Sequence, residues 1–399
     1  MTNIAILGFG VVGSGVADLI TQNYAEVKKF GKDDINIKYI LDLRDFPDSP
    51  FADKVVHDYN LILNDPSVSV VIEVMGGSHP AYEFTVSALK AKKSVITSNK
   101  EVVANFGDEF LAIAKEMGVS YRFEAAVGGG IPVISPMISC IAQNKILEVR
   151  GILNGTTNYI LTKMFTFGDS FESALKDAQD KGYAERNPDA DVLGTDAARK
   201  ITILSALATG SLVSVDKVYT EGITGIRKSD VLCAEKIGCS IKLLGRCISS
   251  EDGPYIFVSP FMLGRDSALS EVSGVYNAVE VVGEPLGNVM FYGKGAGAGA
   301  TASAVVGDLM QTMIYGSLGA PEFEKSNSIK DFATFESKRY FAFEKGAESA
   351  VKDVFGNVAF IDSEECAIIT AKMSESEAKA KTEAISSLGF KLLSTIRIL

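Results

Sequence analysis

A glycine-rich turn near the N-terminus constrains the fold of this chain most. A short apolar run at 2–8 ends in Gly8-Phe9-Gly10-Val11-Val12-Gly13, and a helix-compatible stretch follows at 14–29. Between a strand and a helix, such glycines allow a tight turn, a close approach of the backbone to a pyrophosphate, and close packing of the helix on the strand. The motif therefore predicts a dinucleotide site. A plain glycine turn is the alternative.

The same alternation of strand and helix continues over the first third of the chain. Strands are expected at 35–41, 68–75, 94–98 and 119–126, with helical segments near 80–92 and 101–117. Strands that alternate with helices form a parallel sheet covered by helices. The series predicts a Rossmann-type nucleotide-binding domain of the α/β class.

Two regions with a different composition and a different pattern of expected elements follow. From about residue 130 the chain is rich in Gly, Thr and Asn, and we expect helices at 170–181, 196–209, 228–244 and 302–315, and strands at 255–263 and 272–282. After residue 330 the pattern predicts strand 338–343, helix 346–354, strands 357–361 and 366–371, helix 374–387 and strand 390–398. This βαββαβ order is that of the ferredoxin-like arrangement.

Composition excludes several classes of function. The 39 basic and 50 acidic side chains give a net charge of −11, which argues against nucleic-acid and membrane partners. Two histidines cannot form a three-His zinc site, and five cysteines without a CxxC motif fit neither a disulfide framework nor a zinc ribbon. With no charged leader and no run of about 18 apolar residues, we expect a soluble, cytoplasmic protein.

Two polar positions follow expected strands of the nucleotide-binding domain. Asp42 would suit a ribose 2′-hydroxyl and Arg44 a 2′-phosphate, so both NAD and NADP stay open. Lys100, in the segment Thr97-Ser98-Asn99-Lys100, is expected to point toward the cofactor crevice at the carboxyl end of a strand. An ordinary lysine in a helix-starting turn explains that position equally well.

Two glycine-containing segments offer backbone groups rather than charged side chains. The three glycines of EAAVGGGIP (124–132) free carbonyl groups to converge on a monovalent cation, although a hinge between domains is the simpler interpretation. LNGTTNY (153–159) leads into a helix whose hydroxyls and N–H groups could bind a carboxylate. An ordinary helix cap is the alternative there.

The segment 182–200, GYAERNPDADVLGTDAARK, is the most informative. Asp196 and Lys200 are four residues apart at the start of a helix and share one face, while Glu185 and Asp191 lie on the loop before it. An Asp–Lys pair at this spacing is usually a solvated surface pair. Two carboxylates on a constrained Pro/Gly loop just before the pair favour a functional site.

These segments together resemble the homoserine dehydrogenase family over about residues 1–320. Arg186-Asn187 and Ala298-Gly299 depart from the family pattern, and the C-terminal module resembles a shortened ACT domain. The resemblance implies a dinucleotide-binding domain at 1–130 with about 295–325, an α+β catalytic and dimerisation domain at 131–294, and an ACT-like regulatory module at 331–399. It also implies a homodimer or higher homo-oligomer, and the resemblance to an ACT domain implies feedback by threonine.

The implied reaction is reversible hydride transfer between NAD(P)H and L-aspartate 4-semialdehyde, which gives L-homoserine on the route to threonine and methionine. By similarity, Lys100 and Lys200 flank the reacting carbonyl, and Asp196 orients Lys200. Glu185 and Asp191 would hold the substrate ammonium group, and the remaining substrate-binding residues would be Gly155, Thr156 and Thr157. Because no family role falls to either histidine, proton transfer is expected from lysine.

The expected cofactor and cation sites follow from the same resemblance. The monovalent cation, Na⁺ or K⁺, would lie near Glu124, Val127, Gly129 and Ile131, mostly through backbone carbonyls. The cofactor site comprises Gly8, Phe9, Gly10, Val11, Val12, Gly13, Asp42, Arg44, Gly76, Gly77, Ser98, Asn99, Lys100 and Gly297.

Two other functions compete with this assignment. One is a nucleotide-dependent amino-acid sensor without catalysis. The other is a phosphorylating semialdehyde dehydrogenase, which needs a nucleophilic cysteine in a polar setting. Cys140 lies in the apolar MISCIA and is expected to be buried, which disfavours the second function.

Overall fold

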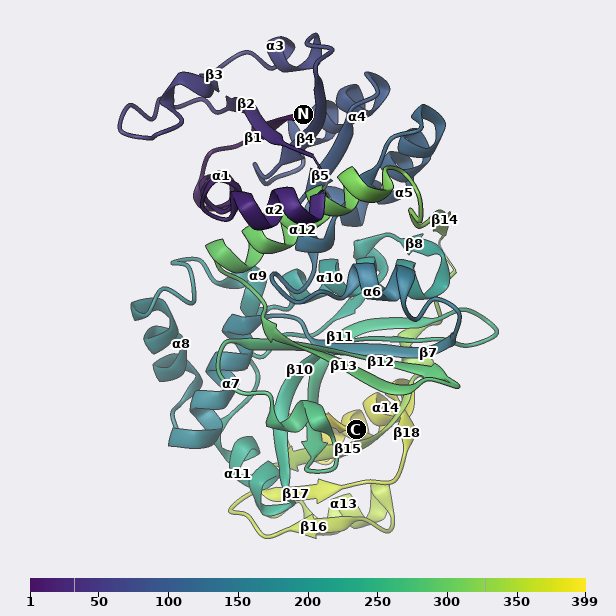
Figure 1. The fold of residues 1–399 in the computed structure, drawn as a ribbon. Helices are drawn as coiled ribbons and strands as arrows, with labels where there is room; N and C mark the ends of the chain where they lie inside the picture. The colour runs from purple at the N-terminus through teal and green to yellow at the C-terminus, as the bar shows by residue number, and fades with distance from the viewer. Residues whose placement is uncertain (32, 327) are drawn as a thin grey trace. The chain divides into compact units, whose positions relative to one another are not determined.

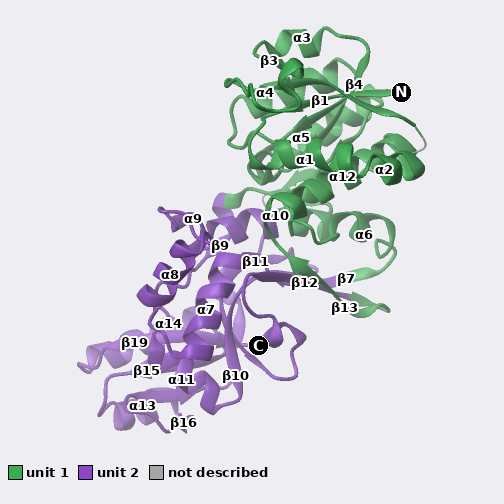
Figure 2. Ribbon diagram, turned by 60° about the vertical axis from the view of Figure 1, so that its left-hand side comes forward, with its two compact units in different colours: residues 1–146, 202–215, 283–327 green, residues 147–201, 216–282, 328–399 purple. Residues whose placement is uncertain are grey.

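A computed structural model describes residues 1–31, 33–326 and 328–399 (Figure 1). The chain divides into two compact units, coloured separately in Figure 2. Unit 1 comprises Met1–Ile146, Thr202–Val215 and Gly283–Asn327, and unit 2 comprises Leu147–Ile201, Asp216–Val282 and Ser328–Leu399. Each unit therefore collects segments that are far apart in the sequence.

Unit 1 contains a six-stranded sheet in which all neighbouring strands run parallel. The strand order is β3-β2-β1-β4-β5-β6. This order is typical of the dinucleotide-binding doubly wound fold, which confirms the predicted parallel Rossmann-type sheet. The strands are β1 (Thr2–Leu7), β2 (Ile35–Leu41), β3 (Val55–Val56), β4 (Val68–Glu73), β5 (Ser94–Thr97) and β6 (Tyr121–Arg122).

The helices of unit 1 cover this sheet. They are α1 (Val11–Gln22), α2 (Tyr24–Gly31), α3 (Tyr59–Leu63), α4 (Ala81–Lys90), α5 (Lys100–Met117), α6 (Ile134–Ser139) and α12 (Ala298–Tyr315). Although α12 is almost 300 residues from α1 in sequence, the two share one core, in which Val16 and Ile20 lie with Val305 and Leu309. The expected single helix at 14–29 is two helices, because Asn23 ends α1.

Shorter elements complete unit 1. They are the 3-10 turns η1 (Ala52–Lys54) and η2 (Glu124–Ala126), the paired strands β8 (Ser211–Val213) and β14 (Glu324–Ser326), and strand β13 (Gly287–Lys294). The last expected strand, 119–126, is only partly a strand. It leaves the sheet after Arg122 and continues as η2.

Unit 2 is built on a mixed sheet with the strand order β12-β7-β10-β11-β19-β15-β17-β16. Its first strands are β7 (Lys145–Ile152), β9 (Tyr219–Thr220), β10 (Cys239–Ile248), β11 (Tyr255–Gly264) and β12 (Tyr276–Glu284). The helices and 3-10 turns are α7 (Gly155–Phe167), α8 (Phe171–Asp180), α9 (Asp189–Val192), α10 (Thr195–Thr209), α11 (Lys228–Lys236), η3 (Val215–Lys217) and η4 (Ala268–Glu271). Of α10, the residues from Thr202 onward belong to unit 1.

The helix predicted at 228–244 in unit 2 was wrong in its second half. The segment 228–244 begins as α11, but Gly238 has φ +72° and ends the helical course, and β10 begins at Cys239. Residues 241–247 of β10 are all buried, so their side chains do not alternate between apolar and polar. Such a continuous run cannot be distinguished from a buried helix by periodicity.

The C-terminal segment has the predicted βαββαβ order with one addition, the two-residue strand β18 before its second helix. Its elements are η5 (Phe332–Thr334), β15 (Glu336–Phe343), α13 (Glu348–Phe355), β16 (Ala359–Ile361), β17 (Cys366–Ile369), β18 (Met373–Ser374), α14 (Glu375–Ser387) and β19 (Leu392–Ile398). The antiparallel order β19-β15-β17-β16 is that of a ferredoxin-like sheet. β19 also pairs in parallel with β11, so this sheet continues into the rest of unit 2.

Among the described helices, none is both long and apolar enough to cross a membrane.

The turn between β1 and α1 gives a stability prediction. A Cβ atom added to Gly13 would lie 2.0 Å from the carbonyl oxygen of Gly8, so α1 must move away from β1 to admit it. We expect Gly13→Ala to lower the free energy of unfolding by about 1–3 kcal/mol, measured by denaturant unfolding.

Gly307→Ala is the matched control within a helix that shares the same core. A Cβ at Gly307 meets no atom within 4 Å. Alanine is favoured over glycine in a helix interior by roughly 0.5–1 kcal/mol, so this variant should be slightly more stable than the parent chain. Equal effects of the two substitutions would contradict the packing argument.

Candidate active site

The turn after β1 has the backbone geometry of a phosphate-binding loop. Gly8 has φ +96°, and Gly13 lies against the Gly8 carbonyl, so both positions require glycine. A Cβ at Gly10, in contrast, meets no atom within 4 Å. Gly10 is also the N-cap of α1 and provides no side-chain cap, so the first N–H groups of α1 can bind an anion.

Asp42 and Arg44 lie beside this loop, as predicted. The Asp42 carboxylate accepts the Phe9 N–H at 2.8 Å and two guanidinium hydrogen bonds from Arg44 at 3.0 and 3.1 Å. These bonds lower the pKa of Asp42 to about 2. The Arg44 side chain is 64% exposed and covers the ring of Phe46, so the guanidinium stays accessible.

A cavity of about 500 Å³ adjoins these groups within unit 1. Gly8, Gly10, Asp42 and Arg44 line it together with Val74 and Met75. Phe9 does not line it, because its ring is buried in the core against Phe46 and Phe51. Val11 is exposed, Val12 packs partly on the core, and Gly297 is the N-cap of α12 with φ +117°.

The carboxyl ends of β4 and β5 are joined by a buried carboxylate that the sequence analysis did not identify. Glu73 is fully buried, accepts the Thr97 hydroxyl at 2.6 Å and the Met75 N–H at 2.8 Å, and has its pKa raised by desolvation. The only sequence signal is a single acid in the otherwise apolar end of a strand. Glu73 fixes the start of the loop that contains Gly76 and Gly77.

Asn99 connects that loop to α5. Its amide donates to the Gly77 carbonyl at 2.7 Å, and its oxygen caps α5 by accepting from the Glu101 N–H. Ser98 N–H bonds to the Glu73 carbonyl at 3.4 Å. Lys100 is the first residue of α5, at the carboxyl end of β5 as predicted. The structure thus brings Gly76, Gly77, Ser98 and Asn99 together at one edge of the sheet.

Glu124, predicted near a cation, uses its side chain to begin α6. Its two oxygens accept the N–H groups of Val133, Ile134 and Ser135 at 2.7–2.8 Å. Its own N–H donates to the buried carboxylate of Asp308, and burial raises the pKa of Asp308 to about 8. A cation here would therefore be held by backbone oxygens rather than by the Glu124 carboxylate.

The other predicted cation neighbours have backbone oxygens that fit this role. Within the described residues, the carbonyl oxygens of Val127, Gly129 and Ile131 accept no hydrogen bond. A Cβ at Gly129 would lie 2.5 Å from the Gly295 carbonyl oxygen, which explains the glycine. The whole segment lies inside unit 1, so it does not connect the two compact units.

In unit 2, Lys200 and Asp196 form a buried ion pair rather than a surface pair. Lys200 is 8% and Asp196 4% exposed, and their charged atoms are 2.7 Å apart. The Lys200 ammonium group also donates to the Leu153 carbonyl at 2.7 Å. These two contacts fix the direction of the ammonium group.

Asn154 is the centre of this cluster, and the sequence analysis did not assign it a role. Its amide donates to Asp191 at 2.6 Å and to Asp196 at 2.9 Å, and its oxygen caps α7 through the Thr157 N–H. Desolvation and the nearby charge of Asp196 raise the pKa of Asp191. An Asn directly before Gly-Thr-Thr is the signal, because Asn is a favoured N-cap.

The predicted substrate residues thus fall into two groups. Asp191, Gly155, Thr156 and Thr157 lie in or next to the Asn154 cluster, and the Thr156 hydroxyl also donates to the Tyr183 carbonyl. Glu185 is exposed on the loop between α8 and α9, and in the described part of the chain its carboxylate makes no hydrogen bond. The structure therefore does not join Glu185 to the cluster.

The expectation that Cys140 is buried was wrong. It is exposed, because it is the C-cap residue just after the one-and-a-half-turn helix α6, whose Ile134 and Met137 face the core. All five cysteines are free thiols.

Family models match most of the chain. Residues 8–124 match the NAD-binding domain of homoserine dehydrogenase, and residues 132–310 match the homoserine dehydrogenase model. A homoserine dehydrogenase of Synechocystis sp. is 41% identical over 319 residues, which are 77% of this chain and 72% of that protein.

Two solved structures are also similar. A homoserine dehydrogenase from Thiobacillus denitrificans superposes with a TM-score of 0.92 at 32% identity, over 100% of this chain and 98% of that chain. A hyperthermophilic archaeal homoserine dehydrogenase mutant in complex with NADPH gives 0.66 at 28% identity, over 78% of this chain and 97% of that chain. With its parallel dinucleotide-binding sheet and its buried Asp196–Lys200 pair, this chain belongs to the homoserine dehydrogenase family.

Proposed function

We propose that this chain interconverts L-aspartate 4-semialdehyde and L-homoserine with a nicotinamide cofactor, as a step of threonine and methionine biosynthesis. The observation that carries the proposal is the buried Lys200–Asp196 pair beside the N-terminus of α7, in the part of the chain that matches the homoserine dehydrogenase model. The family matches favour neither a sensor without catalysis nor a phosphorylating semialdehyde dehydrogenase.

Lys200 is the proposed proton donor and acceptor. Reduction of the aldehyde develops negative charge on its oxygen, which a positioned ammonium group stabilises and protonates. Within the described residues, Asp196 and Leu153 accept two of the three ammonium hydrogens, which leaves the third for the substrate oxygen. The cofactor, when bound, supplies or accepts the hydride. Asp196 holds the Lys200 ammonium group in this orientation.

The substrate's own charges fit the groups around Asn154. Asp191 is the proposed partner of the substrate ammonium group, since its carboxylate is held by Asn154. The N-terminus of α7, with Gly155, Thr156 and Thr157, provides N–H and hydroxyl groups for the substrate carboxylate. Glu185 is a second proposed ammonium partner, which would have to approach from its exposed loop. Lys100 is assigned to the reacting carbonyl on the family resemblance alone.

The proposed cofactor is NADP or NAD, bound by the fourteen residues named in the sequence analysis. The accessible guanidinium of Arg44, beside the cavity that Gly8 and Gly10 line, supports NADP, and the archaeal relative was solved with NADPH. A monovalent cation held by main-chain oxygens near Val127, Gly129 and Ile131 is also part of the proposal. The three-domain division, the ACT-like regulatory role of 331–399, a homo-oligomer and a cytoplasmic location remain predictions.

Lys200→Met tests the proton transfer. We expect kcat for homoserine oxidation to fall by about 10²–10⁴-fold, because general acid–base catalysis contributes that much. NADPH affinity, measured by equilibrium titration, should not change, since Lys200 is not among the proposed cofactor-binding residues. The control is Lys176→Met, an exposed lysine in the same unit. Near-normal kcat in Lys200→Met would contradict the assigned role.

Asp191→Asn tests substrate binding and its pH dependence. Asp191 must be ionised to bind an ammonium group, and its pKa is raised. As the pH is lowered, Asp191 therefore becomes protonated earlier than an ordinary aspartate would. We expect the KM for homoserine to rise from that higher pH onward. The variant should have a KM for homoserine roughly 10–100-fold higher, and this rise of KM at low pH should be absent. Asp189→Asn, on the exposed face of the same α9, is the control, and equal KM changes in both variants would argue against Asp191.

Arg44→Met tests coenzyme choice. If Arg44 binds a 2′-phosphate, the variant should lose roughly 10-fold in kcat/KM for NADP while keeping that for NAD, because one charge-assisted contact is removed. The ratio of the two values in the same preparation is an internal control. A parallel fall for both coenzymes would indicate instead that Arg44 only supports Asp42.

A further inference from the structure

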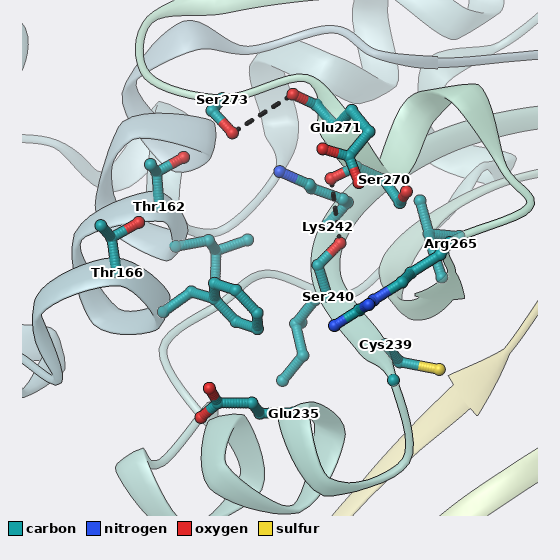
Figure 3. Close-up of a pocket in the computed structure, with 15 residues that line it drawn as sticks. Thr162, Thr166, Glu235, Cys239, Ser240, Lys242, Arg265, Ser270, Glu271 and Ser273 are labelled. Atoms are coloured by element: carbon teal, nitrogen blue, oxygen red, sulfur yellow. Dashed lines mark hydrogen bonds between the residues drawn. The ribbon is translucent and has the colours of Figure 1, made fainter.

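A second cavity lies in unit 2, outside the residues assigned to the reaction. Its volume is about 430 Å³, and it is bordered by the second half of α7, the end of α11, the start of β10 and the segment around η4. Figure 3 shows the labelled side chains around one space, with Thr162 and Thr166 opposite Arg265, and Lys242 opposite Glu235. None of these residues was singled out by the sequence analysis.

Lys242 is the unusual member of this lining. It is only 3% exposed, and its ammonium group donates to the Val272 carbonyl at 2.5 Å and, at 3.4 Å, to the Asn158 side chain. Desolvation lowers the pKa of Lys242 to about 8, so the group is still mainly charged at neutral pH. Among the described residues, no carboxylate lies within 4 Å of it. The carboxylate of Glu271, which also lines the cavity, favours the charged form of Lys242 but makes no ion pair with it in the described structure. A buried cation without a direct ion pair is costly, and proteins normally pair it.

The neighbouring groups favour an anion from outside the chain. The Ser270 hydroxyl is buried and has no hydrogen-bond partner in the described structure. The backbone carbonyl of Ser270 is already occupied by the Ser240 hydroxyl at 3.1 Å. Arg265 adds a second cation at the exposed rim, and Glu235, Glu271 and Thr166 add further polar groups. The Thr162 hydroxyl already donates to the Asn158 carbonyl and accepts from the Gly274 N–H. These side chains suit a small organic molecule that carries a carboxylate and a second polar group.

The cavity is separate from the proposed reaction site. Thr162 and Thr166 follow Asn154 by eight and twelve residues, so α7 holds them roughly 12–18 Å further along its axis. The two regions share this helix, because Asn158, which contacts Lys242, lies one turn after Asn154.

We propose that this cavity binds a small organic carboxylate that also carries a hydroxyl or amino group, with Lys242 as its counter-charge. The ligand carboxylate provides a direct ion-pair partner for the Lys242 ammonium group and an acceptor for the Ser270 hydroxyl. The hydroxyl or amino group of the ligand contacts the side of the cavity that Thr166 and Glu235 line. This site is independent of the proposed dehydrogenase reaction.

Calorimetric titration of the full-length chain with L-lactate and L-alanine tests the proposal, with inorganic phosphate as the comparison anion. We expect saturable binding of one acid or both at one site per chain. Lys242→Met should weaken it by roughly 10–100-fold, as expected for loss of a charge-assisted hydrogen bond, and Ser270→Ala by a smaller factor. Lys200→Met should bind as the parent chain does, which separates this site from the reaction site.

Lys242→Met should fold, because an apolar side chain of similar length replaces a buried cation that has no direct ion pair. Its thermal midpoint and its rate of homoserine oxidation should match those of the parent chain. A failure of the carboxylate proposal can therefore be distinguished from a failure of the proposed function. Three results would overturn the proposal: neither acid binds the parent chain, binding is unchanged in Lys242→Met, or binding is lost in Lys200→Met. Phosphate binding with the same dependence on Lys242 and equal affinity would overturn the carboxylate assignment.

Discussion

The buried ion pair between Lys200 and Asp196 is the interaction on which the catalytic part of this chain depends. A charged pair at 4–8% exposure is stable only where its remaining donors and acceptors are satisfied. Leu153 accepts a second ammonium hydrogen of Lys200, and Asn154 donates to the Asp196 carboxylate; both residues lie at the junction between β7 and α7. These contacts connect the start of α7 with the first turns of α10.

The C-terminal segment is tied to this cluster through unit 2. Arg397 of β19 is 3% exposed and binds Glu375 of α14 at 2.8 Å and Glu221 at 2.6 Å. After Glu221 the chain packs on α9, since Ile223 N–H donates to the Val192 carbonyl, and a Cβ at Gly222 would lie 2.0 Å from that same oxygen. A continuous set of contacts therefore connects the ferredoxin-like sheet with the helix that holds Asp191.

Sequence patterns predicted what is determined locally. The parallel sheet, the glycine turn and the βαββαβ order each leave a periodic or glycine signal, and the structure has all three. The patterns did not predict β10, because burial on both faces removes its alternation. They also did not identify Glu73 and Asn154 as organising residues, because their importance comes from partners 24 to 42 positions away in the sequence. The unit division brings segments separated by more than 200 residues together, which no local pattern reports.

The pairing of β19 with β11 has a consequence for how the chain is made. β11 is synthesised more than 120 residues before its partner, so part of its edge near Phe261 and Met262 stays unpaired while the ribosome completes the C-terminal segment. An open edge of apolar strand residues is a site where nascent chains associate wrongly. The yield of native protein from cells should therefore depend on chaperones that shield this edge during translation. This dependence should be stronger than expected from the stability of the folded protein alone.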